Sequence, residues 1–495
     1  MSVSTFILRL LAKRMFKKIQ TNKRLSEQKQ HSIFKQIIAR GKNSVFAKKF
    51  NIKNGVTYAQ FCNKVKLSEY EDLKAYISRI SNGEKNILTA GSPLYFAITS
   101  GTTSGTKYIP LTKEMMGIQT RAIKELLLLY AYQKNYYDIS GGGMMFIQGS
   151  PELKYLNKIP FAKLSGISAR HVPWFLKRNR FPSMKTNHIK PWGEKVKMIA
   201  KETIGKDLRL IGGIPPWVIT YFDEVLKKTG AQNIKHIFPG LKLYIHGGTN
   251  FAPYRNTFLN LCDNVDTLEV YPASEGFFAY QDDIDDSSLL LLTNHGVFYE
   301  FIRSSDFAAN KIYRIPLEGV ELNTDYVMLV STISGLWAYN TGDTIRFVSK
   351  NPYKIKFSGR AKQYCSAFGE HVIEKEIQTA LNKALSVFGG SISEFTVAPK
   401  ITPKPARHEW FIEFRDAPAN LSDFEKLLNT EMELQNIYYK DLVSSGVIAP
   451  LKMFVVKEGG FNEYMKSIGK FGGQNKCPHL SNNRIIVDFL FQNYV

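Results

Sequence analysis

The hydrophobic and polar positions divide the chain into parts with different periods. From residue 1 to about residue 90, apolar residues recur every three or four positions, which predicts a mostly helical segment. From about residue 91, short apolar or alternating runs such as LYFAIT, LRLIGG, LKLYIHGG and YVMLVST end in glycine or small polar residues. Segments of helical period at 112–134 and 193–204 lie between several of these runs. Strands that alternate with helices and end in glycine-rich turns predict an α/β architecture, with β-sheets flanked by helices.

The pattern changes again after the sequence FSGRAKQY at 357–364. A helical segment at 370–386 is followed by the strand-like run SEFTVAPK, a proline-rich turn and the strand-like run WFIEFRD. An amphipathic segment at 421–435 and a basic tail come next. We therefore predict a helical N-terminal segment packed on the large domain (1–90), a large α/β domain (91–358) and a small, mobile α+β domain (359–495).

The composition is that of a folded globular protein. The 495 residues are 44% hydrophobic and 22% charged, which excludes a disordered or fibrous chain. Four scattered cysteines are too few for a disulfide framework, and the sequence contains neither a CxxC pair nor an HExxH motif for zinc. These features predict a reducing compartment, the cytoplasm.

The charge balance is strongly basic. The chain has 66 Lys and Arg against 43 Asp and Glu, a net charge of +23, so nucleic acid, membrane phosphates and nucleotides are all candidate partners. The cations are spread along the whole chain, and no recognisable nucleic-acid-binding module accompanies them. We therefore expect a basic surface and no nucleic acid partner.

The N-terminal sequence is apolar and basic at once. It contains no run of 18 uncharged apolar residues, and neither does the rest of the chain, so we expect no transmembrane helix. Helical spacing predicts that Phe6, Leu10, Met15 and Ile19 form one face, with cations such as Lys13 around it. One interpretation is a helix on a membrane surface, in weak peripheral contact. The other, which we favour, is a helix docked on the domain with its cations in water.

The densest polar segment is FAITSGTTSGTKYIPLT at 96–112, which begins as a strand-like run. Hydroxyls and backbone N–H groups between glycines form a nest for phosphate oxygens, and Lys107 adds positive charge. The segment is not a Walker A loop, because Lys107 does not directly follow the second glycine and Tyr108 stands where Ser or Thr is required. The alternative is a flexible surface loop.

Two acidic residues also follow strand-like runs. Glu275 comes after LEVYPAS, where a carboxylate oxygen suits Mg²⁺ and Tyr271 offers a flat face to a base. Asp343 ends the sequence YNTGD, which predicts a tight turn between two strands where a carboxylate can accept hydrogen bonds from a ribose diol. Taken alone, each feature is typical of an ordinary strand end or hairpin.

Two basic features complete the set. Arg360 follows a glycine at the predicted domain boundary, and Lys470 and Lys476 lie in the glycine-rich segment GKFGGQNKCPHLSNNR at 469–484. A mobile lysine can stabilise the negative charge that develops in a transition state. The alternative for this segment is a solvated basic tail.

In this order, the five segments resemble the adenylate-forming superfamily, which includes acyl-CoA synthetases, peptide-synthetase adenylation domains and luciferase. The sequences TSGTTSGTKYIP, YPASE and YNTGD are similar to those of the auxin-responsive, Gretchen-Hagen-type acyl acid amido synthetases. The segments HGGTNFAPYR and GKFGGQNKCPHLSNNR resemble the bacterial branch of that family. The resemblance extends from about residue 90 to the C-terminus.

The resemblance implies a two-step ligase that uses ATP and Mg²⁺. A carboxylic acid attacks the α-phosphate of ATP, pyrophosphate leaves, and an acyl-adenylate forms. An amine, typically that of an amino acid, then attacks the acyl carbonyl and AMP leaves. Such chemistry depends on positioning and charge neutralisation more than on covalent catalysis. The alternative is a ligase that transfers the acyl group to CoA or to a carrier thiol.

The resemblance also implies roles for individual residues. Lys476 would be the lysine of the small domain that acts in adenylation, with Lys470 as the second candidate. Glu275 would bind Mg²⁺, Asp343 would bind the ribose hydroxyls, and Arg360 would contact the nucleotide from the hinge. The residues expected to bind the nucleotide are Ser100, Thr102, Thr103, Ser104, Lys107, Gly247, Gly248, Tyr271, Pro272, Ala273, Ser274, Asp343 and Arg360.

Two positions depart from the family pattern. His479 stands beside Pro478 where the pattern has an arginine, so a titrating group replaces a fixed charge. Asn340 stands where many members have an arginine, which removes one cation near the phosphates.

The acyl pocket is expected in the middle of the large domain. Its candidate lining residues are Trp174, Trp217, Val218 and Tyr221, with ordinary core packing as the alternative for each. The identities of the acid and of the amine, and the oligomeric state, stay open at this point.

Overall fold

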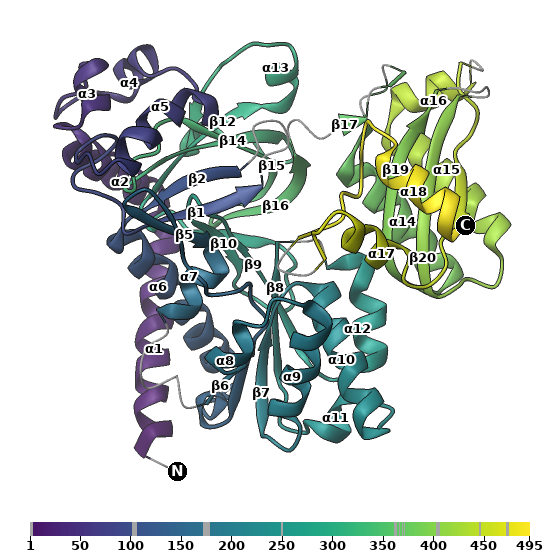
Figure 1. The fold of residues 1–495 in the computed structure, drawn as a ribbon. Helices are drawn as coiled ribbons and strands as arrows, with labels where there is room; N and C mark the ends of the chain where they lie inside the picture. The colour runs from purple at the N-terminus through teal and green to yellow at the C-terminus, as the bar shows by residue number, and fades with distance from the viewer. Residues whose placement is uncertain are drawn as a thin grey trace.

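The computed structural model describes residues 3–100, 106–171, 179–248, 251–360, 364–365, 367–368, 370, 372–401, 406–444, 447–471 and 475–495. A large body contains the N-terminus, and a smaller body contains the C-terminus (Figure 1). This arrangement confirms the predicted α/β fold with a large N-terminal domain and a small C-terminal domain.

The N-terminal part is helical, as its apolar spacing predicts. Its helices are α1 (Val3–Arg24), α2 (Ser26–Gly41), α3 (Val45–Lys49), α4 (Tyr58–Lys64) and α5 (Tyr70–Ser81). At the first turns of α3 and α4, the side-chain hydroxyls of Ser44 and Thr57 accept hydrogen bonds from the backbone N–H groups of Ala47 and Gln60. Phe34 of α2 packs against Phe298 of the main sheet, with ring centroids 4.8 Å apart, so these helices cover one face of that sheet.

Among the described residues, the main sheet has twelve strands. In spatial order they are β13 (Ile315–Pro316), β12 (Val297–Arg303), β14 (Asp325–Thr332), β15 (Tyr339–Lys350), β16 (Tyr353–Arg360), β11 (Leu289–Leu291), β10 (Phe277–Gln281), β9 (Asp266–Pro272), β8 (Leu243–Gly247), β7 (Leu208–Gly212), β3 (Gly143–Phe146) and β6 (Arg180–Phe181). From β9 to β6 neighbouring strands are parallel, and from β13 to β9 they are antiparallel. The carboxyl ends of β7, β8 and β9 therefore meet at one edge, where open α/β sheets bind ligands.

Helices cover both faces of the parallel half of this sheet. They include α6 (Lys113–Gln133), α9 (Trp192–Thr203), α10 (Pro215–Thr229) and α12 (Arg255–Leu261). One face packs on α9, α10 and α12 and the other on α6 and α1. Burial on both faces explains why β7 and β8 have almost continuous apolar sequences.

A second, four-stranded sheet lies beside the main one and has the order β2 (Thr106–Leu111), β1 (Tyr95–Ser100), β5 (Ile159–Lys163), β4 (Lys154–Leu156). Strands β1 and β2 form an antiparallel hairpin in which Thr99 pairs with Lys107. The shorter helices of the large domain are α7 (Leu164–Arg170), α8 (Met184–Asn187), α11 (Ile234–Ile237) and α13 (Ser304–Ala308).

The small domain has its own three-stranded sheet of β19 (Ser391–Lys400), β20 (Arg407–Asp416) and β21 (Lys452–Val455). The two-residue strands β17 (Tyr364–Cys365) and β18 (Val372–Ile373) precede it. Its helices are α14 (Glu374–Phe388), α15 (Leu421–Gln435), α16 (Ile437–Ser444), α17 (Gly460–Ser467) and α18 (Ile485–Tyr494). The interpretation of the C-terminal segment as a basic tail is incomplete, because β21 pairs in parallel with β20 and the segment also contains α17 and α18.

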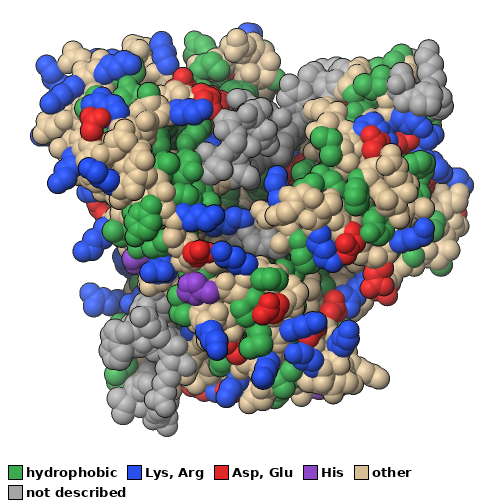
Figure 2. All heavy atoms as spheres, viewed as in Figure 1, with side chains coloured by type: hydrophobic (Ala, Val, Ile, Leu, Met, Phe, Trp, Pro, Cys, Tyr) green, Lys and Arg blue, Asp and Glu red, His purple; other side chains and the backbone are tan. Residues whose placement is uncertain are grey.

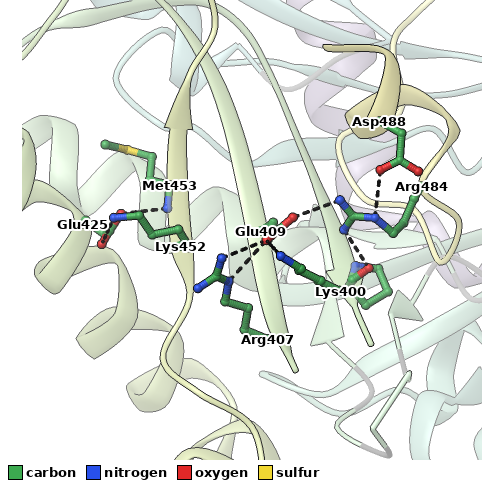
Figure 3. A network of polar contacts seen from close by, with 9 residues as sticks. Lys400, Arg407, Glu409, Glu425, Lys452, Met453, Arg484 and Asp488 are labelled. Atoms are coloured by element: carbon green, nitrogen blue, oxygen red, sulfur yellow. Dashed lines mark hydrogen bonds and ion pairs between the residues drawn. The ribbon is translucent and has the colours of Figure 1, made fainter. Parts of the chain in front are cut away.

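A buried carboxylate fixes the C-terminal segment to the small-domain sheet. Glu409 of β20 lies among the cations of Lys400, Arg407 and Arg484, at 3.6, 3.1 and 2.9 Å (Figure 3). Arg484 directly precedes α18 and also bonds Asp488. A buried acid needs such compensation, so the network holds the start of α18 against the sheet.

The predicted single apolar face of the N-terminal helix is wrong. Met15 and Ile19 pack toward α6, but Phe6 and Leu10 are exposed. A helix turns about 100° per residue, so the nine positions from Phe6 to Met15 place these side chains on opposite sides. No helix among the described residues is long and apolar enough to cross a membrane.

Candidate active site

A cavity of about 2930 Å³ lies where the ends of the parallel strands face the small domain. It brings together residues that are far apart in the sequence. The predicted site residues on its wall are Lys107, Trp217, Gly247, Gly248, Tyr271, Pro272, Ala273, Ser274, Glu275, Asp343, Lys470 and Lys476. Both domains therefore contribute to one site.

Tyr271, at the end of β9, and Asp343, on β15, are in direct contact. The Tyr271 hydroxyl donates a hydrogen bond to Asp343 Oδ2 over 2.5 Å. The Tyr271 ring is held edge-on between Phe278 and Phe357, with ring centroids at 5.2 and 5.8 Å. Packing thus fixes the ring, and the ring hydroxyl orients the buried carboxylate.

The predicted tight turn at YNTGD is wrong in detail. Asp343 lies within β15, in a bulge where residues 341–343 oppose the single residue Met328 of β14. Gly342 adopts a φ of +78°, and its N–H bonds Asn340 Oδ1 over 2.9 Å. Thr341 Oγ1 accepts the Asp343 N–H over 3.2 Å. Local side chains thus stabilise the bulge, which directs Asp343 toward the cavity.

Asn340 has a structural function in this bulge. Its Nδ2 donates to Glu69 Oε1 over 2.9 Å, and its backbone N–H bonds the Ser68 carbonyl. The asparagine that departs from the family pattern therefore connects the start of α5 to β15.

The end of β8 approaches the small domain closely. A Cβ on Gly247 would lie 2.1 Å from the Val270 carbonyl oxygen, so only glycine fits beside β9. Gly248 has a φ of +77°, and a Cβ there would lie 3.4 Å from Lys476 Nζ. The ammonium group of Lys476 is therefore placed at the carboxyl ends of the parallel strands.

The segment around Lys476 is held from both domains. Lys163 of β5 donates to Asn475 Oδ1 over 3.1 Å, and burial lowers the pKa of this lysine. On the small-domain side, Val397 and Thr396 of β19 bond the carbonyls of His479 and Pro478, over 2.8 and 2.7 Å. The backbone next to Lys476 thus extends along β19 and is not a solvated tail.

His479 lies between two carboxylates, Glu374 at 3.0 Å and Glu394 at 3.1 Å, and stacks on Phe395. Burial alone would lower its pKa, but the hydrogen bonds to Glu374 and Glu394 raise the pKa to about 9. Glu394 Oε1 also accepts a hydrogen bond from the hydroxyl of Tyr254, a large-domain residue, over 3.0 Å. This chain of contacts links the large domain to the segment that contains Lys476.

A second contact between the domains is the bidentate ion pair of Arg415 with Asp223, at 2.6 and 2.9 Å. Thr257 Oγ1 also donates to the Ile392 carbonyl over 3.4 Å. Together with the His479 contacts, these bonds fix the orientation in which Lys476 faces Gly248.

Two titratable residues on the cavity wall, the half-buried Glu269 and the buried His246, were missed in the sequence. Burial raises the pKa of Glu269 to about 7, and burial together with Arg255 lowers the pKa of His246 to about 3. They pair across β8 and β9. Both occur in strand-like runs, and the sequence carries no signal that separates them from ordinary strand residues.

The predicted acyl-pocket residues do not all lie on the cavity wall. Trp217 lines the cavity, with Trp192 at a ring-centroid distance of 4.9 Å. Val218 and Tyr221 do not line it, because on α10 they point into the core, where the Tyr221 hydroxyl bonds Thr203. Their assignment to the pocket is wrong.

Several predicted residues cannot be placed by their side chains. Thr102, Thr103, Ser104 and Trp174 lie outside the described residues. For Ser100 and Arg360 the backbone alone is described, and Arg360 pairs with Asp343 across β15 and β16.

The fold is that of the two-domain ligases that form acyl-adenylates. A solved structure of AtGH3.15 acyl acid amido synthetase in complex with 2,4-DB is 19% identical, with a TM-score of 0.83 over 98% of this chain and 96% of that one. A solved structure of a 2-hydroxyisobutyryl-CoA ligase in the postadenylation state is 12% identical, with a TM-score of 0.62 over 93% of this chain and 91% of that one.

Three models of one family match the chain. They describe the GH3 family N-terminal domain at 15–192, the central domain at 290–360 and the C-terminal domain at 375–485. Together these ranges cover well over half of the sequence, and the chain belongs to the GH3 family. The predicted family is thus confirmed, whereas the bacterial branch stays a prediction.

Curated relatives extend over nearly the whole chain. Indole-3-acetic acid-amido synthetase GH3.4 of Arabidopsis thaliana is 22% identical over 91% of this chain and 88% of its own. Indole-3-acetic acid-amido synthetase GH3.5 of the same plant is 23% identical over 94% of this chain and 90% of its own.

Proposed function

We propose that the chain is an ATP-dependent acyl acid amido synthetase, which joins a carboxylic acid to an amine, typically that of an amino acid. The observation that carries the proposal is the meeting of Asp343, Tyr271 and Lys476 in one cavity of a GH3-family fold. The GH3.4, GH3.5 and AtGH3.15 relatives, each named as an amido synthetase, support the same reaction.

In this proposal the nucleotide lies across the ends of β8 and β9. The buried Asp343 carboxylate accepts hydrogen bonds from the ribose hydroxyls, and the Tyr271 ring packs against the base. Gly247 and Gly248 border the adenine. The hydroxyls of the loop after β1 bind the phosphates, together with Lys107, and Arg360 contacts the nucleotide.

Glu275 fits the expected magnesium site. It is a half-buried carboxylate on the cavity wall, next to the end of β9, and hard carboxylate oxygens are the ligands that Mg²⁺ prefers. When bound, Mg²⁺ supplies positive charge that neutralises the phosphate oxygens of ATP.

Lys476 acts in the first step. The acid's carboxylate oxygen attacks the α-phosphorus, the bond to the pyrophosphate oxygen breaks, and the Lys476 ammonium stabilises the charge that develops. In the second step the amine nitrogen attacks the acyl carbonyl, the bond to the AMP oxygen breaks, and the nitrogen loses a proton. Positioning by the two domains supplies most of the catalysis.

The acyl group of the substrate is apolar. Trp217, Trp192, Phe146 and Ile147 line one part of the cavity, and an apolar wall of this kind favours an aromatic or aliphatic acid. We further propose that the enzyme acts in the cytoplasm and belongs to the bacterial branch of the family. Four free cysteines support the reducing compartment.

Pyrophosphate release by the purified protein tests the function. The protein is given Mg-ATP and single carboxylic acids, first alone, then with mixed amino acids, then with CoA. We expect release that requires an acid and continues in the presence of amino acids. Release that continues only with CoA would assign the protein to the thioester ligases, and no acid-dependent release would contradict the proposal.

A further inference from the structure

The N-terminal end of α1 exposes four large apolar side chains in little more than one turn. Phe6, Ile7, Leu10 and Leu11 are 52, 50, 55 and 43% exposed. At 100° per residue they cover about 140° of the helix circumference. Isolated exposed apolar residues are common, but a contiguous apolar surface at the end of a helix marks an interaction site.

Cations surround this apolar tip. Arg9, Lys13, Arg14 and Lys17 are exposed, and none of them forms an ion pair with a residue that the structure describes. Lys17 lies on the same side of the helix as Leu10, about 10 Å farther along the axis. The face therefore changes from apolar to cationic along its length.

The opposite face of α1 attaches the helix firmly to the large domain. Ala12 and Ile19 are buried, and Phe16 stacks on Tyr132 of α6 at a centroid distance of 4.5 Å. Figure 1 shows α1 running along α6, with its N-terminal end at the edge of the molecule. The tip is thus presented on a rigid support and needs no folding step before it binds.

The charge of this helix selects the partner. Residues 3–24 contain seven Lys and Arg and no Asp or Glu. A second copy of the chain would bring the same cations, and the two sets of cations would repel each other. Nucleic acid would attract the cations but offers no apolar surface to the tip. An anionic bilayer accepts both parts, because apolar side chains enter the acyl boundary while Lys and Arg remain at the phosphates.

We propose that the tip of α1 docks the protein reversibly on anionic phospholipid membranes. Phe6, Ile7, Leu10 and Leu11 enter the interface, and Arg9, Lys13, Arg14 and Lys17 bind the headgroups. The proposal rests on the exposed residues of α1 and uses no step of the adenylation chemistry, so it stands whether or not the proposed reaction is correct.

Vesicle co-sedimentation of the full-length protein tests the proposal. The vesicles contain either equal parts of phosphatidylglycerol and phosphatidylcholine or phosphatidylcholine alone. We expect binding to the anionic vesicles that is at least tenfold weaker on phosphatidylcholine and falls steeply with salt. The double variant Phe6→Ser, Leu10→Ser should lose at least tenfold in binding, and Lys13→Gln, Lys17→Gln should lose several-fold.

The control replaces equally exposed apolar residues elsewhere. Val387 on α14 and Leu434 on α15 are 54 and 69% exposed, and Val387→Ser, Leu434→Ser should bind as the wild type does. Thermal unfolding checks that every variant is folded. Unchanged vesicle binding by the Phe6, Leu10 variant would overturn the proposal. So would light scattering that shows a dimer in the wild type, no dimer in that variant and no vesicle binding by either.

Discussion

At the scale of single residues, the site depends on side chains whose neighbours set their orientation or charge. The Asp343 carboxylate is oriented by the Tyr271 hydroxyl, and the Tyr271 ring is in turn fixed between two phenylalanines. His479 is surrounded by two carboxylates, which favour its protonated form. Both ring nitrogens of the buried His479 have hydrogen-bond partners, as burial requires.

Asp343→Asn should raise the KM for ATP at least tenfold, because an amide replaces one acceptor oxygen by a donor and loses the charge-assisted bonds to the ribose. Tyr271→Phe is the matched variant. It keeps the ring and removes only the hydroxyl, so it should raise the KM two- to fivefold. Acid-dependent pyrophosphate release measured against ATP concentration gives both values. An unchanged KM in Asp343→Asn would contradict the ribose assignment.

His479 should make the stability of the protein depend on pH. The pKa of His479 is raised in the folded state. Its contribution to the free energy of unfolding is therefore complete below about pH 6.5 and is lost as the pH rises through about 9. His479→Gln should lower the free energy of unfolding at pH 6 by on the order of 2–3 kcal/mol, and the difference should narrow toward pH 9.5. Urea unfolding of both proteins between pH 6 and 9.5 measures this.

The control for His479 is the exposed residue His188, where His188→Gln should leave the pH dependence unchanged. Identical pH profiles for the wild type and His479→Gln would mean that the pKa of His479 is the same in the folded and unfolded protein, and would contradict the prediction.

At the scale of elements, the end of β8 meets the segment after α17, which contains Lys476. Gly247, which ends β8, is too close to β9 for any side chain, and Gly248, which follows it, faces Lys476. The segment 477–481 extends along β19 through backbone hydrogen bonds. Lys476 is therefore positioned by strand-like backbone and not by a free loop.

Lys476→Ala should slow acyl-adenylate formation about a hundredfold, as expected when a preorganised cation is removed from a transition state. Lys470→Ala is the matched control and should change the rate less than threefold, because the ammonium group that lies against Gly248 is that of Lys476. Single-turnover pyrophosphate release separates this step from amide formation. If Lys470→Ala were the slower variant, the assignment would move to Lys470.

At the scale of the whole molecule, two features stand out: the contact between the domains and the basic surface. Tyr254–Glu394 and Asp223–Arg415 cross the interface and orient the small domain. Lys and Arg side chains are scattered over the face seen in Figure 2 and do not gather in one patch, which agrees with the expectation of a generally basic surface.

Charge reversal tests whether the interface contact supports catalysis. Asp223→Arg places two cations together and should slow adenylation five- to tenfold, and adding Arg415→Asp should restore most of the rate. The exposed Arg79–Glu84 pair is the control, and Glu84→Arg should leave the rate unchanged. A double variant as slow as the single one would show that the ion pair does not orient the small domain for adenylation.

The sequence by itself determined the local elements. Helical spacing correctly predicted α6, α9 and α15, and short apolar runs ending in small residues correctly predicted β7, β8 and β9. It also determined the order of the five site segments, which identified the family. Local patterns suffice for this, because hydrophobic period and turn residues report the backbone conformation directly.

Only the tertiary structure decided which surfaces meet. The sequence could not show that Val218 and Tyr221 face the core or that Asp343 lies in a bulge. Nor could it join His479 to Tyr254, more than two hundred positions away. The hydrophobic period of the sequence predicts that a residue lies on the apolar face of a helix or strand. Contacts between distant parts of the chain decide which other element packs against that face.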